Sequence, residues 1–235
     1  HQQLLLPRNY FNWLNVVPYA GFRFSHYSSR SSHDSDFGQM NDLDRSVFNT
    51  GVEFSFKASN TWPDAKLSFL DVDGLRHVMQ PMANYVFVPD PNKRPWEIPQ
   101  FDRELHSLRL RPIDFPDYNS IDTIDSRNVL RIGVRNRLQT KRFGLVDDVL
   151  NWELFTDWRL ETGIYEDRFN DIYSNLEVKP RSWLLLGSEL RYDPNNRLLN
   201  ESNHTISLLP NNKWSLTLGH RYLRDWAQEE LKVRY

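Results

Sequence analysis

The chain has 235 residues, 29 of them basic and 31 acidic, and it contains no cysteine. The near-neutral balance argues against a protein that binds polyanions through its net charge, and the lack of cysteine excludes disulfide bonds and thiolate metal sites within the segment. Hydrophobic residues make up only 39% of the chain and aromatic residues 14%, a combination typical of a wall that is apolar on one side and carries aromatic girdles.

Alternating apolar and polar side chains recur along almost the whole chain. An extended strand sends successive side chains to opposite faces, so the alternation predicts strands with one apolar and one polar face. In chain order, we expect strands at 13–27, 47–58, 75–88, 127–142, 149–161, 172–179, 183–193, 203–210, 214–223 and 227–235. No amphipathic helix interrupts them, so the sequence predicts an all-β chain of about ten strands.

The stretch RNVLRIGVRNRLQTKR at 127–142 separates its two kinds of side chain most clearly. Our candidates for the apolar, lipid-facing side are Leu130, Ile132, Val134, Trp152, Leu154 and Trp158. Our candidates for the polar, lumen-lining side are Arg131, Arg135, Arg137, Glu153, Asp157, Arg159, Glu189 and Arg191. Arg131, Arg135 and Arg137 could pair with the acidic residues of the next strand, which are Glu153, Asp157 and Glu161.

The connections between the predicted strands alternate in length. Two long polar segments, 28–45 and 89–126, contrast with the short ones at 142–148, 180–182 and 211–213. In an up-and-down sheet alternate connections lie at opposite ends, and outer-membrane barrels have long extracellular loops and short periplasmic turns. Two connections break this rule: 59–74 is long at the short-turn end, where Trp62-Pro63 would begin a bent excursion, and 224–226 is short at the opposite end.

Two all-β architectures fit this pattern. In a soluble sandwich the apolar face packs against a second sheet, whereas in a membrane barrel it meets lipid and the polar face lines a wet interior. Long strands, aromatic residues near strand ends and dense mixed charge on the polar side favour the barrel. No apolar run approaches the roughly 20 residues of a membrane-spanning helix. The sequence therefore predicts an antiparallel up-and-down transmembrane β-barrel segment, part of a larger barrel, in the bacterial cell outer membrane.

Three stretches resemble the lipopolysaccharide-assembly outer-membrane protein family LptD. The first, LRHVMQPMANYVFVPDPN at 75–92, matches it at Arg76, His77, Pro81, Tyr85, Phe87, Val88 and Pro89. The second, around 101–142, matches it at Asp125, Asn128, Gly133, Asn136, Arg137 and Leu138. The third, at 188–225, matches it at Tyr192, Asp193, Tyr222 and Leu223. The order and spacing of these stretches agree with the family over most of 16–225.

The resemblance implies a translocon that receives lipopolysaccharide from a periplasmic bridge protein and inserts it into the outer leaflet. Members of the family have a large barrel, usually plugged by a lipoprotein, and a periplasmic jelly-roll domain. We expect 1–235 to be a single segment from the middle of such a barrel, without the jelly-roll and without the seam between first and last strands. Its expected partners are lipopolysaccharide, outer-membrane lipid, a plug lipoprotein and, through regions outside this segment, the bridge protein. The resemblance implies that Arg131, Arg135 and Arg137 bind phosphate or sugar groups of lipopolysaccharide, or the plug protein, instead of the acidic residues of the next strand. A generic porin or channel and a soluble β-sandwich binding module remain the alternatives.

The sequence predicts neither catalysis nor a bound cofactor or metal ion. The acidic loop at 33–44 lacks the spacing and closing bidentate Glu of an EF-hand. The seven histidines form no H-x-x-x-H pair, and Ser25 and His26 fall on opposite faces, so they cannot act as a nucleophile and base. Basic and aromatic residues lie largely on opposite faces, which argues against a nucleic-acid partner.

Overall fold

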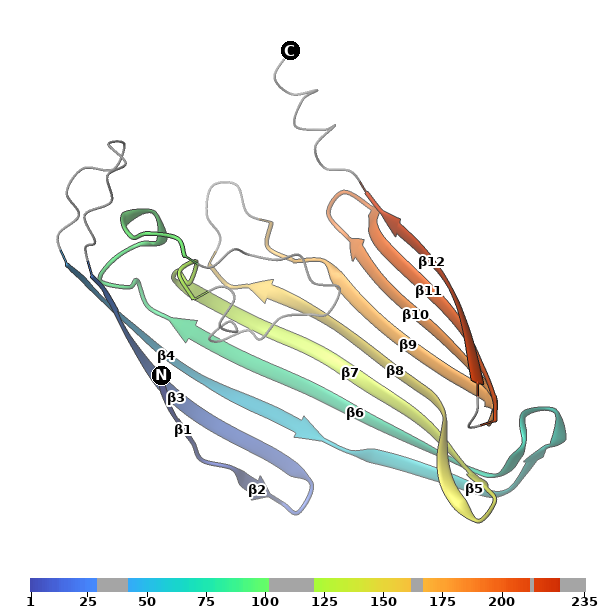
Figure 1. The fold of residues 1–235 in the computed structure, drawn as a ribbon. Coiled ribbons are helices and arrows are strands. Elements are labelled where there is room, and N and C mark those ends of the chain that lie inside the picture. The colour runs from blue at the N-terminus through green and yellow to red at the C-terminus, as the bar shows by residue number, and fades with distance from the viewer. Residues whose placement is uncertain (29–41, 102–120, 162–166, 212–213, 225–235) are drawn as a thin grey trace.

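The computed structural model describes residues 1–28, 42–101, 121–161, 167–211 and 214–224, and these form one antiparallel sheet of 12 strands (Figure 1). The all-β prediction is confirmed. The strands are β1 (Gln2–Leu5), β2 (Arg8–Tyr10), β3 (Leu14–Tyr27), β4 (Leu43–Phe56), β5 (Ala58–Leu67), β6 (Val72–Val88), β7 (Arg127–Arg142), β8 (Leu145–Arg159), β9 (Ile172–Arg181), β10 (Leu184–Asp193), β11 (Leu198–Asn211) and β12 (Trp214–Leu223). Two short 3-10 turns, η1 (Ser68–Leu70) and η2 (Pro95–Glu97), complete the elements. Neither of these described helical turns is long and apolar enough to cross a membrane.

The order of the strands is that of an up-and-down sheet. From β6 to β12 each strand pairs with the next one along the chain. The sheet is curved, and within the described residues its outermost strands, β1 and β12, do not pair with each other (Figure 1). These residues therefore form an open part of a barrel wall, as predicted.

Two of the strand positions are occupied by interrupted strands. Both β1 and β2 pair with β3, and both β4 and β5 pair with β6. The first break contains Pro7, which has no N–H to donate to the sheet. The second break is the single residue Lys57, after which β5 pairs with the N-terminal half of β6. Each pair of pieces therefore covers about the length of one continuous strand.

Several boundaries differ from the predicted ones. The segment 59–74, expected to be a bent excursion, is instead the hairpin of β5, η1 and the start of β6. A register shift between Trp62 and Lys66 accommodates Pro63 there. Because the shift interrupts the alternation of apolar and polar residues, the sequence pattern did not identify β5 as a strand. The edge strand formed by β1 and β2 was not predicted because Pro7 interrupts its short alternation. The predicted strand at 227–235 lies outside the described residues.

The connections define two ends of the sheet. At the short-turn end lie the connections at 11–13, 68–71, 143–144 and 182–183. At the long-loop end lie the connections after β3, β6 and β8, which are longer, and the four-residue turn at 194–197. The predicted asymmetry is thus present, and the turn at 194–197 is shorter than its end would suggest. Asp193 holds that turn by accepting hydrogen bonds from the backbone N–H groups of Asn195 (2.8 Å) and Asn196 (3.2 Å).

A small hydrophobic core lies at the long-loop end on the polar face of β3, β4 and β6. Its members, Tyr19, Val47, Val86, Val88 and Ile124, are all buried. The first four come from strand positions of polar parity, whereas Ile124 comes from the loop before β7. This loop therefore folds back over the polar face and covers apolar side chains there.

Candidate functional site

The polar face of the sheet is organised by ion pairs between neighbouring strands. Arg131 of β7 binds Asp157 of β8 through two contacts, Nε to Oδ1 at 2.6 Å and Nη2 to Oδ2 at 2.9 Å. Arg135 forms an ion pair with Glu153, its direct cross-strand neighbour. The prediction that the arginines of β7 pair with the next strand is confirmed for these two. Their charge is therefore already neutralised within the wall.

Arg137 departs from this arrangement. The register places Asn151, not a carboxylate, opposite it, and Glu161, the third carboxylate considered as a partner for these arginines, lies beyond the end of β8. Pairing with the next strand, expected for the three arginines as a group, therefore does not hold at Arg137. Within the described part of the chain Arg137 forms no ion pair, so of the three arginines it is the one whose charge is available to another molecule.

The remaining polar candidates, on β8 and β10, also point to the polar side and contact neighbouring segments. Arg159 donates to the backbone oxygen of Asp167 at 2.9 Å, and Glu189 accepts a hydrogen bond from Asn203 at 3.4 Å. Arg191 pairs with Asp171. The polar face is thus a connected network of charged and amide groups.

The opposite face carries exposed apolar side chains. Ile132 is 40% exposed, and Trp152 and Trp158 are exposed to a similar degree. The other three candidates, Leu130, Val134 and Leu154, are partly exposed. Further exposed residues of this face are Phe22, Phe24, Phe48, Phe54, Ile206, Leu216 and Leu218. No second layer of the described chain covers this face, so the sandwich alternative finds no support in the described residues.

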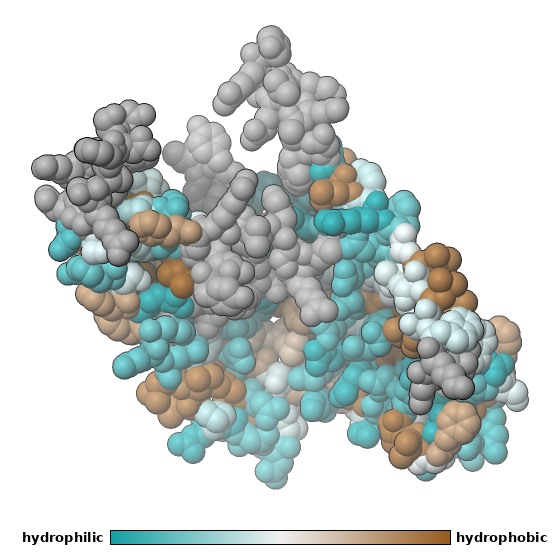
Figure 2. Space-filling model, viewed as in Figure 1, coloured by the Kyte–Doolittle hydropathy of each residue, from teal (hydrophilic) through white to brown (hydrophobic). Residues whose placement is uncertain are grey.

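The distribution of burial is inverted relative to a water-soluble domain. Arg45, Asn49, Arg142, Asn200 and Glu201 are among the buried residues, whereas large aliphatic and aromatic side chains are exposed. In soluble proteins charged residues are almost never fully buried unless paired, and contiguous apolar surface is small. In Figure 2 hydrophilic residues predominate on the coloured part of the face toward the viewer, and hydrophobic ones form separate patches toward its lower left and right margins. The molecule therefore suits an apolar surrounding and a polar interior.

At the long-loop end, Arg45 holds the inward-folded loop. The Arg45 side chain is buried, with the residue only 1% exposed, and donates to the backbone oxygens of Lys93 (3.1 Å), Ile121 (3.2 Å), Asp122 (3.2 Å) and Ile124. A buried guanidinium needs several acceptors to offset its lost hydration. One side chain of β4 thus fastens both flanks of the long connection between β6 and β7.

Tyr27, at the last position of β3, makes a second contact with the connection between β6 and β7. Its hydroxyl donates to Asp122 Oδ1 at 2.5 Å, and its ring stacks on Phe101 with centroids 6.1 Å apart. Tyr27 and Arg45 therefore both bind the Asp122 region of this connection, one through a side-chain oxygen and the other through a backbone oxygen.

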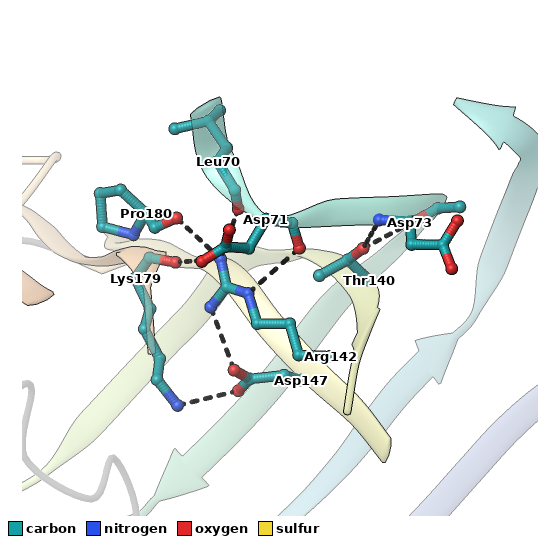
Figure 3. Close-up of polar contacts among 9 residues, drawn as sticks. Leu70, Asp71, Asp73, Thr140, Arg142, Asp147, Lys179 and Pro180 are labelled. Atoms are coloured by element: carbon teal, nitrogen blue, oxygen red, sulfur yellow. Dashed lines mark hydrogen bonds and ion pairs between the residues drawn. The ribbon is translucent and has the colours of Figure 1, made fainter. Parts of the chain in front are cut away.

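At the short-turn end, Arg142 joins three hairpins (Figure 3). Its side chain is 2% exposed and pairs with Asp147 at 3.1 Å. Its Nη2 lies 2.9 Å from the backbone oxygens of Leu70, Lys179 and Pro180. Residue 70 belongs to the β5–β6 turn, and residues 179 and 180 to the end of β9. Arg142 therefore ties hairpins together across strands that are not neighbours in the sheet.

The described residues contain no group of three or more His, Cys, Asp or Glu side chains that could hold a metal ion. Most of the acidic loop at 33–44 lies outside the described residues. His26 bonds to Asp44 through Nδ1 at 2.7 Å, and His204 stacks on His220 with ring centroids 6.4 Å apart. Within the described residues neither pair belongs to a cluster of metal-binding side chains.

Comparison with known protein families identifies the family of this chain. The family model for LptD, LPS transport system D, matches residues 5–232. The chain belongs to the LptD family. No curated protein sequence matches it. The family is one of lipopolysaccharide transport and outer-membrane assembly, so the resemblance inferred from the three sequence stretches is confirmed at that level.

Two of those stretches contact each other in this LptD-family chain. Tyr85 of β6 donates through its hydroxyl to Asn128 Oδ1 of β7 at 3.1 Å, and His77 Nε2 lies 3.1 Å from Asn136 Oδ1. Both contacts lie on the apolar parity, where isolated polar groups would be unfavourable and pairing between strands satisfies them. Residues that appeared as two separate sequence motifs thus form one continuous piece of the LptD wall.

Arg45 and Arg142 were not among the residues that the sequence singled out. Both lie at strand ends, where the alternation of apolar and polar residues carries no information on tertiary contacts. The available signal was indirect, because each arginine occurs where a strand meets a connection with backbone oxygens left to satisfy. Their partners lie up to 79 residues away in the chain, so only the folded structure identifies them.

Proposed function

We propose that this chain forms part of the wall of an outer-membrane translocon that inserts lipopolysaccharide into the outer leaflet. The observation that carries the proposal is the inverted burial, with apolar side chains exposed on one face and paired charges on the other, in a chain of the LptD family. A bilayer offers hydrocarbon to the first face, and a water-filled lumen solvates the second.

In this proposal the apolar face, including Ile132, Trp152 and Leu154, meets the hydrocarbon core of the outer membrane. The polar face, including Arg137 and Glu189, lines the lumen. A bilayer cannot solvate the unpaired N–H and C=O groups of a sheet edge. We therefore propose that β1 and β12 pair with further strands in the complete barrel.

The proposed partners follow from these surfaces. Lipopolysaccharide would pass along the polar face, where the free guanidinium of Arg137 offers charge-assisted hydrogen bonds to phosphate or sugar oxygens. A plug lipoprotein would occupy the same lumen, and a periplasmic bridge protein would dock through regions outside this segment.

Photocrosslinking in the intact protein tests this function. A photoreactive amino acid in place of Arg137 or Glu189 should form adducts with lipopolysaccharide in cells. The control position is Leu216, an exposed residue of β12 near the short-turn end, where we expect phospholipid and no lipopolysaccharide. A small-solute porin would give no lipopolysaccharide adduct at any of the three positions, and that result would refute the proposal.

A further inference from the structure

Exposed aromatic side chains occupy the tips of the short turns. Phe11 lies in the turn between β2 and β3 and is 79% exposed, and Phe143 lies in the turn between β7 and β8 and is 92% exposed. Phe69, in the turn between β5 and β6, is 81% exposed, and Trp183, between β9 and β10, is also exposed. An aromatic side chain thus recurs on each of these four turns.

Two of these aromatic residues have a backbone conformation that is unfavourable for a bulky side chain. Phe11 (φ 55°) and Phe143 (φ 53°) take the first central position of turns in which both central residues have positive φ. Such turns favour Asn, Asp or Gly, because a bulky side chain is strained in the left-handed region. The second central residues, Asn12 and Gly144, follow this preference. The same unfavourable residue in two separate turns indicates that the phenyl ring has a role outside the turn itself.

Further apolar side chains accompany two of the tips. Phe11 stacks on Trp13 with centroids 6.3 Å apart, and Trp13 packs edge-on against Phe56 of β4 at 5.5 Å. Next to Phe143, Leu145 and Val146 are exposed as well. Apolar surface at these two turns is therefore larger than the single ring at the tip.

Basic side chains accompany the aromatic ones. Lys141 is exposed beside Phe143, and Arg8 is exposed on β2. The Arg181 guanidinium lies 5.9 Å from the ring centroid of Phe69 and pairs with Asp71, and Lys66 of β5 pairs with Asp73. Aromatic residues with adjacent Lys and Arg suit the boundary between hydrocarbon and headgroups, where the rings enter the membrane and the cations meet phosphates.

We propose that the aromatic tips of the short turns insert into the headgroup region of the adjacent phospholipid leaflet. The inference rests on the proposed function, because it assumes that the apolar face meets hydrocarbon. The tips are spread over hairpins from β2 to β10, an arc that a membrane contacts evenly, whereas a single docked domain would cover one sector. The short turns then lie within the membrane boundary and do not project into the aqueous periplasm.

Spin labelling in the full-length protein tests the proposal directly. The segment has no cysteine, so Phe143→Cys introduces a single labelling site within it. After reconstitution into phosphatidylethanolamine–phosphatidylglycerol liposomes, power saturation with oxygen and with a water-soluble nickel chelate reports the depth of the nitroxide. We expect the oxygen-to-nickel accessibility ratio at position 143 to lie between those of two control positions.

The controls are Leu218→Cys and Arg197→Cys. Leu218 lies on the exposed apolar face of β12, and Arg197 is an exposed turn residue with a similar backbone (φ 57°) at the opposite end. A ratio at position 143 equal to that at 197, with position 218 in lipid, would overturn this proposal alone. An aqueous ratio at position 218 would overturn the proposed function as well. Low accessibility of position 143 to both reagents would indicate a protein partner and would also overturn the proposal.

Phe143→Asn supplies a second test that does not depend on labelling. Asn is preferred at this turn position, so a purely structural role predicts an unchanged or faster rate of folding into liposomes. Membrane insertion of the ring predicts a severalfold slower rate despite the better turn. An unchanged or faster rate would contradict the proposal.

Discussion

Replacing Arg142 by Ala should destabilise the short-turn end of the wall. The guanidinium pairs with Asp147 and shares its Nη2 hydrogens among the oxygens of Leu70, Lys179 and Pro180. Two hydrogens cannot fully satisfy three acceptors, so the loss is smaller than the number of contacts suggests. Lys179 still neutralises Asp147, at 3.0 Å, which further limits the loss. Removing one partner from a buried pair lowers the free energy of unfolding by about 3–5 kcal/mol, and with these two offsets we expect a loss of about 3 kcal/mol for Arg142→Ala.

Urea unfolding of the reconstituted full-length protein, followed by tryptophan fluorescence, measures this change. Lys141→Ala is the matched control, because Lys141 is exposed and adjacent in β7, and we expect it to change the free energy of unfolding by less than about 0.5 kcal/mol. Equal stability of the two variants would refute the reasoning that Arg142 ties the hairpins together.

Three further predictions follow from other contacts. Asp157→Asn should lower stability by about 3 kcal/mol because it leaves Arg131 without its charged partner, while Arg131→Met combined with Asp157→Leu should recover part of the loss in the same unfolding assay. Gly133→Ala should destabilise the wall by about 1–3 kcal/mol, since its Cβ would lie 2.0 Å from Phe155, whereas Gly219→Ala, whose nearest neighbour would be 3.7 Å away, should be nearly neutral; equal effects would contradict the packing argument. Tyr27→Phe removes the hydroxyl that donates to Asp122 Oδ1 and should lower the free energy of unfolding by about 1.5–3 kcal/mol; unchanged stability in the same assay would contradict a structural role of this contact.

Much of the fold follows from local side-chain alternation. At β7 and β8 the period of two is nearly unbroken, so strand identity, facing residues and approximate ends were all predictable. The same rule fails where the chain is irregular. The edge strand of β1 and β2 was missed because of Pro7, and β5 was missed because of the register shift around Pro63. Both irregularities interrupt the alternation of apolar and polar residues from which strands were predicted.

The candidate site was predictable as two sets of residues but not as a network. Parity alone separates Arg131 from Ile132. Which side chains pair depends on the register between neighbouring strands. The register shift between Leu138 and Gln139 shows that this register cannot be obtained by counting residues along the chain. Arg137 is the instructive position: the sequence grouped it with Arg131 and Arg135, and only the strand alignment shows that Asn151 stands opposite it.

The amino-acid sequence by itself determined that the chain is a set of two-faced strands and to which family it belongs, because alternation and motif order are properties of the chain alone. The tertiary structure decided which charges are neutralised, how Arg45 and Arg142 fasten distant segments, and that aromatic rings stand at the turn tips. These features arise from contacts between residues far apart in the chain, and such contacts exist only once the strands have aligned.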